Sequence, residues 1–362
     1  MKCRIKRIAA LMAAFILVTL TLVPSSASGV CAQEGVALPA SLTLPVARQQ
    51  TLMLYPGGMP FGVKFYTEGV LVVGFCDIET DGIKTNPAYA AGLRLKDVIT
   101  AVDGVALNDA QQLTARIDAS EGKPLELTYR REGSEYTVTL TPVYSPAEGK
   151  YKTGVWVRDS GAGIGTVTFI DPDTGAFGGL GHGICDGDTG ELTPMLRGTV
   201  TTVTISGLTR GIAGDPGEVR GYFNPDKCGT LLNNTENGVF GIFTDLPAQP
   251  PEGALPAAKR DQIHAGEAYI WCTLDDNKPC KYSIRISDID PSSHSNKCFT
   301  VTVTDPALLE KTGGIIQGMS GSPIIQNGRL VGAVTHVLIN DPTRGYGIFI
   351  DNMLERMGEL AG

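Results

Sequence analysis

Residues 312–325 read Thr-Gly-Gly-Ile-Ile-Gln-Gly-Met-Ser-Gly-Ser-Pro-Ile-Ile, a glycine-rich turn that leads into an apolar strand. A nucleophilic serine needs an exposed hydroxyl on a tight turn, with backbone N–H groups close by for the developing oxyanion. Gly318 lets the chain turn so that its own N–H and that of Ser320 can converge, and Gly321 leaves room beside the serine. Ser320 is therefore a better candidate nucleophile than Ser322. Taken alone, the stretch fits an ordinary hairpin turn equally well.

A histidine in a constrained backbone setting supplies the candidate general base. Residues 177–183 read Phe-Gly-Gly-Leu-Gly-His-Gly, which places His182 between two glycines after an apolar run. An unhindered imidazole at the end of a strand suits proton transfer to and from a serine hydroxyl. Of the other histidines, His336 follows Ser320 by 16 residues, on the strand that continues from the serine. We therefore expect His182 to be the base.

Short apolar or β-branched runs, separated by turn signals, recur from residue 152 onward. They lie at 165–170, 199–205, 238–243, 267–274, 282–286, 298–303, 322–325 and 330–335. This pattern is typical of antiparallel barrels or sandwiches. The order His then Ser on such a pattern resembles chymotrypsin-type proteases, with Met319 and Ser322 in place of the Asp and the second Gly of their Gly-Asp-Ser-Gly-Gly-Pro motif. The Gly-x-Ser-x-Gly elbow of α/β-hydrolases and the His-Glu-x-x-His motif of zincins are both absent.

A different domain precedes this region. Residues 88–104 read Ala-Tyr-Ala-Ala-Gly-Leu-Arg-Leu-Lys-Asp-Val-Ile-Thr-Ala-Val-Asp-Gly. Around them the pattern predicts a buried strand, a helix capped by Asn108 and two alternating strands, at 69–75, 108–119, 125–131 and 135–141. This order of elements resembles a PDZ domain, with Lys96 where a glycine is usual. The expected fold is therefore mainly β, with an N-terminal PDZ-like domain followed by a chymotrypsin-like antiparallel double β-barrel.

PDZ domains bind the carboxylate of a peptide through backbone N–H groups of a loop, and the peptide pairs as an added strand. Residues 59–63, Met-Pro-Phe-Gly-Val, would match that loop. The expected peptide-binding residues are then Phe61, Gly62 and Val63. The alternative is a glycine turn in a small β domain that has no ligand.

The N-terminus has the layout of a secretory signal. A basic stretch at 2–7 is followed by an apolar run of 16 residues at 8–23 and by Pro24. The run is slightly short for a spanning helix, so removal of the segment and its retention as an anchor are both open. The expected organisation is a signal peptide or signal-anchor, a linker, the PDZ-like domain and the peptidase domain, at 1–33, 34–54, 55–143 and 150–362.

The charge and the cysteines limit the possible partners. The net charge is −8, and the chain beyond its basic N-terminus is more acidic still. Such a chain repels phosphate backbones, so nucleic-acid binding is not expected.

Export permits disulfides between some of the eight cysteines. Cys272, Cys280, His294 and Cys298 lie close enough in sequence for a zinc site, but they lack the usual Cys-x2-Cys spacing.

The two peptidase segments also resemble one particular family. A signal-anchor, a PDZ domain, the Gly-Leu-Gly-His-Gly-Ile-x-Asp segment at 179–186 and the Gly-Gly-Ile-Ile-Gln-Gly-Met-Ser-Gly-Ser-Pro segment occur here in this order. Together they resemble the stage IV sporulation protein B peptidases of endospore-forming bacteria, over essentially the whole chain after residue 50. The resemblance implies a serine endopeptidase whose triad acid lies on the Thr-Asp-x-x-Leu-Leu stretch at 304–309, which is Asp305.

The sequence alone does not decide which carboxylate orients the histidine. Asp186, Asp215 and Asp245 are also candidates. Asp305 could also be a helix N-cap, because Pro306 and the residue after it fit a first helical turn, and that role could coexist with orienting a histidine.

The expected reaction is peptide hydrolysis through an acyl-enzyme, with no metal or organic cofactor. The resemblance implies cleavage of the chain's own N-terminal segment and of a membrane-associated regulator. That regulator would restrain an intramembrane protease that matures a late sporulation sigma factor. The implied location is beyond the cytoplasmic membrane, in the space between forespore and mother-cell membranes, with membrane contact through the N-terminal segment. The alternatives are a non-catalytic PDZ adaptor and a general envelope quality-control protease.

Overall fold

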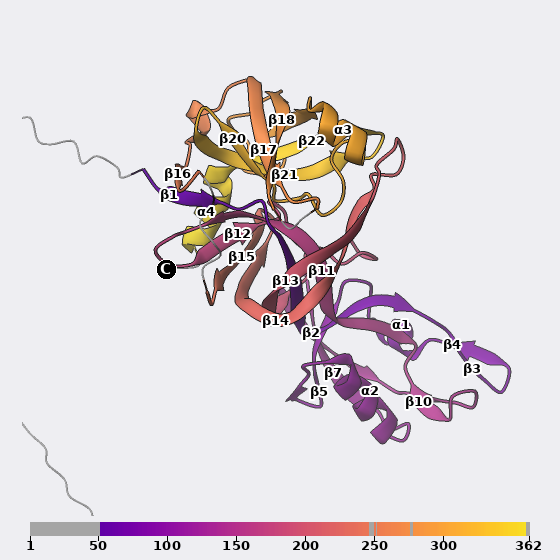
Figure 1. The fold of residues 1–362 in the computed structure, drawn as a ribbon. Helices are drawn as coiled ribbons and strands as arrows, with labels where there is room; N and C mark the ends of the chain where they lie inside the picture. Colours follow the sequence, from indigo (N-terminus) through magenta and orange to yellow (C-terminus); the bar gives the residue numbers. More distant parts are fainter. Residues whose placement is uncertain (1–50, 246–249, 251, 276–277, 360–362) are drawn as a thin grey trace, which may run out of the picture. The chain divides into compact units, whose positions relative to one another are not determined.

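The computed structural model describes residues 51–245, 250, 252–275 and 278–359 (Figure 1). The predicted signal segment, Cys3 and Cys31 lie outside these ranges, as does nearly all of the predicted linker. None of the helices within them is long and apolar enough to span a membrane. The described chain is mainly β, as predicted.

The C-terminal part forms a closed antiparallel barrel of six strands. In order around the barrel they are β17 (Gly266–Cys272), β18 (Cys280–Ser287), β19 (Phe299–Val303), β22 (Asp341–Phe349), β21 (Arg329–Leu338) and β20 (Pro323–Gln326). The short helix α3 (Pro306–Thr312) follows β19, and α4 (Ile350–Glu359) follows β22. Alternating burial along β18 shows why the sequence alternates there: inward residues such as Ile284 and Ile286 fill the core.

A second ring of six strands precedes this barrel. The order is β2 (Pro60–Phe75), β11 (Val155–Ile170), β12 (Ala176–Gly179), β15 (Gly238–Phe243), β14 (Glu218–Thr235) and β13 (Met195–Thr209), and β2 pairs with both β13 and β11 to close the ring. The strand β1 (Met53–Pro56) adds to β11 and also pairs with β16 (Leu255–Pro256). Phe61, Phe65, Phe177 and Phe243 are the largest side chains in its core. The predicted double β-barrel is therefore confirmed.

The PDZ-like elements lie between β2 and β11. The far half of β2 continues into a sheet with β5 (Val98–Val102), β7 (Leu125–Arg131) and β8 (Ser134–Leu140), and β6 (Val105–Ala106) pairs with β5. The helices are α1 (Pro87–Ala91) and α2 (Ala110–Ala119), and the pairs β3 (Ile78–Thr80) with β4 (Ile83–Thr85) and β9 (Val143–Ser145) with β10 (Lys150–Lys152) complete the domain. The cap of α2 is Asp109 and not Asn108, since its carboxylate accepts the N–H of Gln112. Lys96 has a φ of +77°, which explains why a glycine is usual there.

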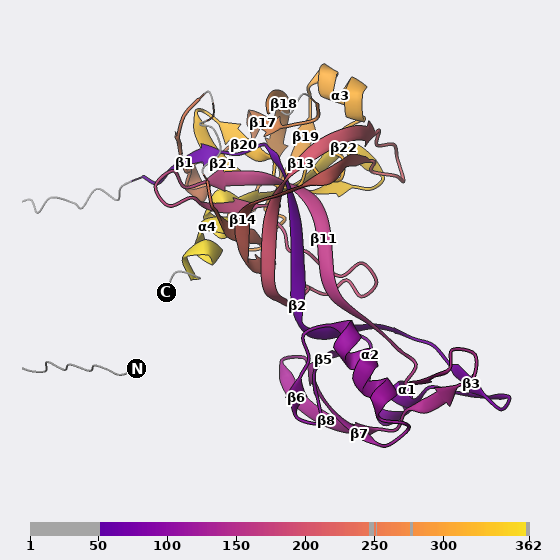
Figure 2. The same cartoon turned by 60° about the horizontal axis from the view of Figure 1, so that its bottom comes forward.

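The strand pairing differs from the predicted start of the PDZ-like domain at residue 55. Residues 55–56 and 60–66 belong to the first barrel, because they pair with β11 or with both β11 and β13. The cause is the length of β2, a single strand of 16 residues that starts in the barrel and ends in the PDZ-like sheet. The PDZ-like domain is thus an insertion between the first two strands of the six-stranded ring. Figure 2 shows β2 and β11 running side by side.

Candidate active site

The nucleophile turn connects Gln317 to strand β20. Gly318 and Gly321 have φ values of +97° and +94°, in the left-handed region that favours glycine. Met319 between them is buried and anchors the turn in the core of the second barrel. Ser320 is half-buried, whereas Ser322 is fully buried and donates its hydroxyl to the Met319 carbonyl at 2.6 Å. Ser322 therefore has a structural role, and Ser320 carries the accessible hydroxyl.

Strand β11 fixes the direction of the peptide groups in this turn. The N–H of Thr166 donates to the Ser320 carbonyl at 3.0 Å, and its hydroxyl donates to the Gly318 carbonyl at 2.8 Å. Among the backbone hydrogen bonds of the described ranges, neither the Gly318 N–H nor the Ser320 N–H has an acceptor. Two unpaired N–H groups beside a nucleophile are what an oxyanion site requires. The N–H groups of Gly318 and Ser320, the predicted donors, are thus free to bind an oxyanion.

His182 lies in the loop that follows β12. Leu180 and Gly181 precede it with φ values of +65° and +67°. A Cβ on Gly181 would lie 2.9 Å from Thr335 Cγ2, so only glycine lets this loop lie against the second barrel. The Nδ1 atom of His182 is 2.8 Å from the Gly183 carbonyl oxygen. If Nδ1 carries the proton and donates it there, Nε2 keeps a lone pair and can act as a base.

His182 and Ser320 line the same cavity, which has a volume of about 550 Å³. Its walls also include Leu180, Gly318 and, from β21, His336. In the structure the Ser320 hydroxyl donates to the Thr335 carbonyl at 2.6 Å. Proton transfer to His182 therefore requires the serine hydroxyl to turn from that carbonyl to the imidazole.

His336 is a second imidazole in this site, and the sequence had given it no role. Its ring centroid lies 4.8 Å from that of His182, and its Nδ1 is buried without a hydrogen-bond partner in the described chain. Burial first, and then the neighbouring His182 and Lys297, lower the pKa of His336 to about 4. Burial also lowers the pKa of His182, partly offset by its bond to the Gly183 carbonyl. Both imidazoles are therefore neutral at neutral pH, as a general base must be.

The lowered pKa of His182 leads to a pH prediction. A general base works only when it is unprotonated, so activity falls as the pH falls through its pKa. Because burial lowers this pKa below 6.5, the acid limb of kcat/KM should have its midpoint below pH 6.5. The measurement is kcat/KM on a peptide substrate across the pH range over which the fold is stable. A midpoint at or above 6.5 would contradict the buried environment described for His182.

The structure does not bring Asp305 to His182. One carboxylate oxygen of Asp305 accepts the N–H groups of Ala307 and Leu308 at 3.0 and 3.1 Å, and the other accepts that of Ser283 at 3.1 Å. Asp305 is thus the N-cap of α3, where its carboxylate satisfies N–H groups that have no partner within the helix. The structure thus gives Asp305 a capping role and shows no hydrogen bond between its carboxylate and His182, so it does not support the predicted triad role.

The other candidate acids have different partners as well. Asp186 is buried and forms an ion pair with Arg158, Asp215 accepts the N–H of Gly217, and Asp245 lines a separate cavity. Within the described ranges, no carboxylate is hydrogen-bonded to His182. The hydrogen-bond partner of this imidazole is the Gly183 carbonyl, so the described residues offer a candidate serine–histidine dyad without an acid.

Two substitutions at Asp305 separate a capping role from a catalytic one. Asparagine caps a helix about as well as aspartate, so Asp305→Asn should keep turnover close to that of the native chain. Asp305→Ala should lower the free energy of unfolding by about 1 kcal/mol, which a denaturant titration measures. If Asp305→Asn instead lost several orders of magnitude in turnover at unchanged stability, the carboxylate would have to reach His182 during catalysis.

The predicted PDZ carboxylate loop is also corrected. Phe61, Gly62 and Val63 lie inside strand β2, paired with β11 on one side and with β13 on the other. Their side chains and peptide groups are thus committed to the first barrel, and Phe61 and Val63 are buried. Gly62 serves packing, because a Cβ there would lie 2.4 Å from Phe223 Cδ1.

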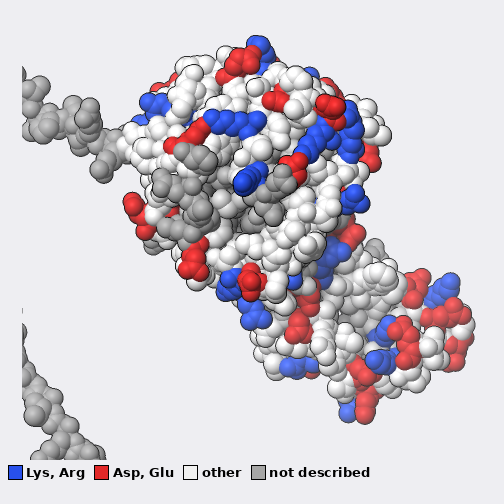
Figure 3. Space-filling model, in the orientation of Figure 1, with Lys and Arg blue, Asp and Glu red and all other residues white. Residues whose placement is uncertain are grey.

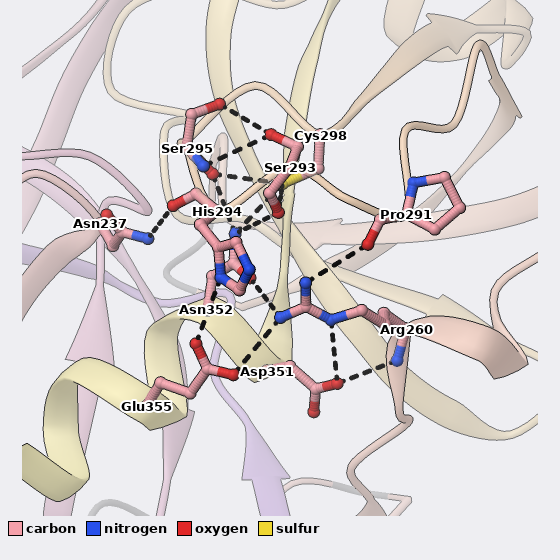
Figure 4. A network of polar contacts seen from close by, with 10 residues as sticks. All are labelled: Asn237, Arg260, Pro291, Ser293, His294, Ser295, Cys298, Asp351, Asn352 and Glu355. Atoms are coloured by element: carbon pink, nitrogen blue, oxygen red, sulfur yellow. Dashed lines mark hydrogen bonds and ion pairs between the residues drawn. The ribbon is translucent and has the colours of Figure 1, made fainter.

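The cysteines and histidines that the sequence offered for a zinc site have different neighbours in the second barrel. Cys272 and Cys280 lie opposite each other on β17 and β18, while His294 faces Glu355 at 3.6 Å. Figure 4 shows that His294 and Cys298 belong to a polar network with α4, in which the Asn352 amide reaches the Cys298 sulfur at 3.3 Å. No three potential metal ligands converge in the described part of the chain, and its six cysteines are free thiols.

Two protein families match the sequence. Residues 149–354 match the family described as SpoIVB peptidase S55, and residues 63–141 match the PDZ domain family. A curated relative, LL2128 of Lactococcus lactis subsp. lactis (strain IL1403), is 35% identical over 94 residues, and its name provisionally describes a zinc metalloprotease. This match covers 26% of the chain, and the chain spans only 20% of the length of that relative.

Solved structures resemble parts of the chain. The active form of the Rv3671c protease from M. tuberculosis is 16% identical, with 56% of this chain and 75% of that chain covered and a TM-score of 0.33. The PDZ domain of the SdrC-like protein Lmo2051 from Listeria monocytogenes is 22% identical, with 25% and 87% covered and a TM-score of 0.21. Each of these structures is similar to only a part of this chain.

Proposed function

The chain belongs to the SpoIVB peptidase S55 family and is a serine endopeptidase, and we propose that it processes its own N-terminal segment and cleaves a membrane-associated regulatory protein during endospore formation. The observation that carries the chemistry is the shared cavity of His182 and Ser320, beside two unpaired backbone N–H groups. The proposed role in endospore formation rests on the family to which the chain belongs.

The proposed mechanism passes through an acyl-enzyme. The Ser320 oxygen attacks the scissile carbonyl while His182 takes its proton, and the N–H groups of Gly318 and Ser320 stabilise the oxyanion. His182 then protonates the leaving amine, and a water molecule releases the acyl group by the same route. The bond from Nδ1 to the Gly183 carbonyl keeps the imidazole in the tautomer that this sequence of steps needs.

We propose that the chain acts outside the cytoplasmic membrane, in the space between the forespore and mother-cell membranes. The basic and apolar N-terminal segment at 1–33 supports export and membrane contact. The acidic balance of the chain favours protein partners over nucleic acid. On the face drawn in Figure 3, the basic side chains of the described residues are interspersed with acidic ones and form no extended basic surface.

The experiment that tests this proposal uses the full chain. The native chain and Ser320→Ala are incubated separately, and any new N-termini are sequenced. The expected result is cleavage within the first ~50 residues of the native chain and none in the variant, because an acyl-enzyme cannot form without the serine oxygen. Adding native chain to Ser320→Ala then tells whether one molecule cleaves another. Equal processing of both chains on their own would overturn self-cleavage.

A further inference from the structure

Two cysteines of the second barrel lie opposite each other on neighbouring strands. Cys272 is the last residue of β17 and Cys280 is the first residue of β18, and the strand register pairs them directly. Directly opposed residues of an antiparallel pair have Cα atoms about 4.5 to 5.5 Å apart, and a disulfide joins Cα atoms about 4.4 to 6.8 Å apart. The backbone therefore already holds these two residues at a distance that a disulfide can span.

The two side chains also share one face of the sheet. Burial alternates along β18, where Tyr282 and Ile284 point inward, so Cys280 lies on the inward face as well. Cys272 is in the same core cluster as Tyr282 and is 1% exposed, whereas Cys280 is exposed at the end of its strand. One thiol is thus shielded, and solvent can reach the other.

No other two of the six described cysteines are strand partners. Cys185 forms an isolated bridge with Leu192, and the Cys298 sulfur accepts a hydrogen bond from the Asn352 amide at 3.3 Å. The direct opposition of two thiols is therefore particular to the ends of β17 and β18 within the described part of the chain.

The connection between these strand ends, at 273–279, is held by contacts on two sides. Thr273 donates its hydroxyl to the Gly58 carbonyl at 2.9 Å, and Asp275 forms an ion pair with Lys311 of α3. These contacts support the register of the two strand ends. Little rearrangement is then needed for the two sulfur atoms to meet.

We propose that Cys272 and Cys280 form a disulfide that joins the ends of β17 and β18 and stabilises the second barrel. The structure shows the pair in its reduced form. The oxidant is a disulfide donor that reacts by thiol–disulfide exchange, either oxidised glutathione or a protein disulfide. The export proposed above would place the chain where such bonds persist, and the inference does not depend on the substrate of the peptidase.

The exchange takes two steps. The exposed Cys280 thiolate attacks one sulfur of the donor, and the other sulfur leaves as a thiolate. Burial raises the pKa of Cys272, so this thiol is the poorer first nucleophile. Cys272 then loses its proton and attacks the Cys280 sulfur of the mixed disulfide, which releases the second donor thiolate. In total the two thiols give up two electrons and two protons, and the donor disulfide becomes two thiols.

The test locates the bond by peptide mapping of the full chain in a Ser320→Ala background, so that self-cleavage does not alter the sample. The folded chain is equilibrated with a mixture of reduced and oxidised glutathione, free thiols are alkylated, and the chain is digested with endoproteinase Asp-N without reductant. This enzyme cleaves before Asp275, so Cys272 and Cys280 fall on separate peptides. We expect most of these two peptides to remain joined and to separate when a reductant is added.

Thermal unfolding gives a second readout. The oxidised chain should unfold at a temperature at least about 3 °C higher than the reduced chain, because a disulfide restricts the unfolded chain. Cys280→Ser changes an exposed residue and should lose both the joined peptides and this difference. Cys76→Ser is the matched control, since it removes an exposed thiol of the PDZ-like domain, and it should keep both.

The proposal is overturned if Cys272 and Cys280 are both alkylated in the folded, equilibrated chain, or if either is joined to a different cysteine. Equal unfolding temperatures of the oxidised and reduced chains would overturn the stabilising role.

Discussion

Ser320→Ala should lower peptidase turnover by about three orders of magnitude or more, with the fold intact. The substitution removes the only atom that can form the acyl bond in the proposed mechanism. The hydroxyl is half-buried and its one hydrogen bond goes to the Thr335 carbonyl, so little structural support is lost. Turnover on a protein substrate and a thermal unfolding curve measure the two effects separately.

Ser322→Ala is the matched control for this variant. Its hydroxyl is buried and bonds to the Met319 carbonyl, so its loss should cost about 1 kcal/mol of stability and a much smaller part of the turnover. If Ser320→Ala retained turnover while Ser322→Ala lost it, the nucleophile would have been assigned to the wrong serine.

His182→Ala should abolish turnover to a similar degree. It removes the base that activates the serine, and residues that act as a unit each cost nearly the full effect when removed. His294→Ala should leave turnover unchanged, because that imidazole is exposed and faces Glu355 outside the cavity. Turnover of both variants is measured at a pH well above the lowered pKa of His182.

His336→Ala decides between the two imidazoles of the site. The ring lines the cavity beside His182, but its buried Nδ1 has no partner in the described chain to orient it. Its removal should therefore cost less than the removal of His182. A loss as large as that of His182→Ala would make His336 a member of the catalytic unit.

The sequence predicted those parts of the site whose geometry is local. Glycines around Ser320 and His182 indicate backbone turns, and the structure has left-handed φ values at Gly181, Gly318 and Gly321. Alternating apolar runs predict strands because burial alternates along them. These features depend on a few neighbouring residues, so a single sequence carries them.

The remaining features depend on contacts between distant segments. Gly62 looks like part of a ligand loop, yet the packing of Phe223 from another strand is what requires a glycine there. Asp305 fits both a cap and a triad acid until the position of His182 is known. The pairing of β11 with both halves of β2 joins the barrel to the PDZ-like domain, and such register is set by long-range packing.

The most direct test of the central claim is covalent labelling with a fluorophosphonate, which reacts with an activated serine and needs no known substrate. The labelled chain is digested and the modified residue is located by mass spectrometry. The expected result is an adduct on Ser320 in the native chain, no adduct in Ser320→Ala and much slower labelling in His182→Ala. A folded native chain that is not labelled at Ser320, or labelling at Ser320 that does not slow in His182→Ala, would contradict the serine–histidine mechanism.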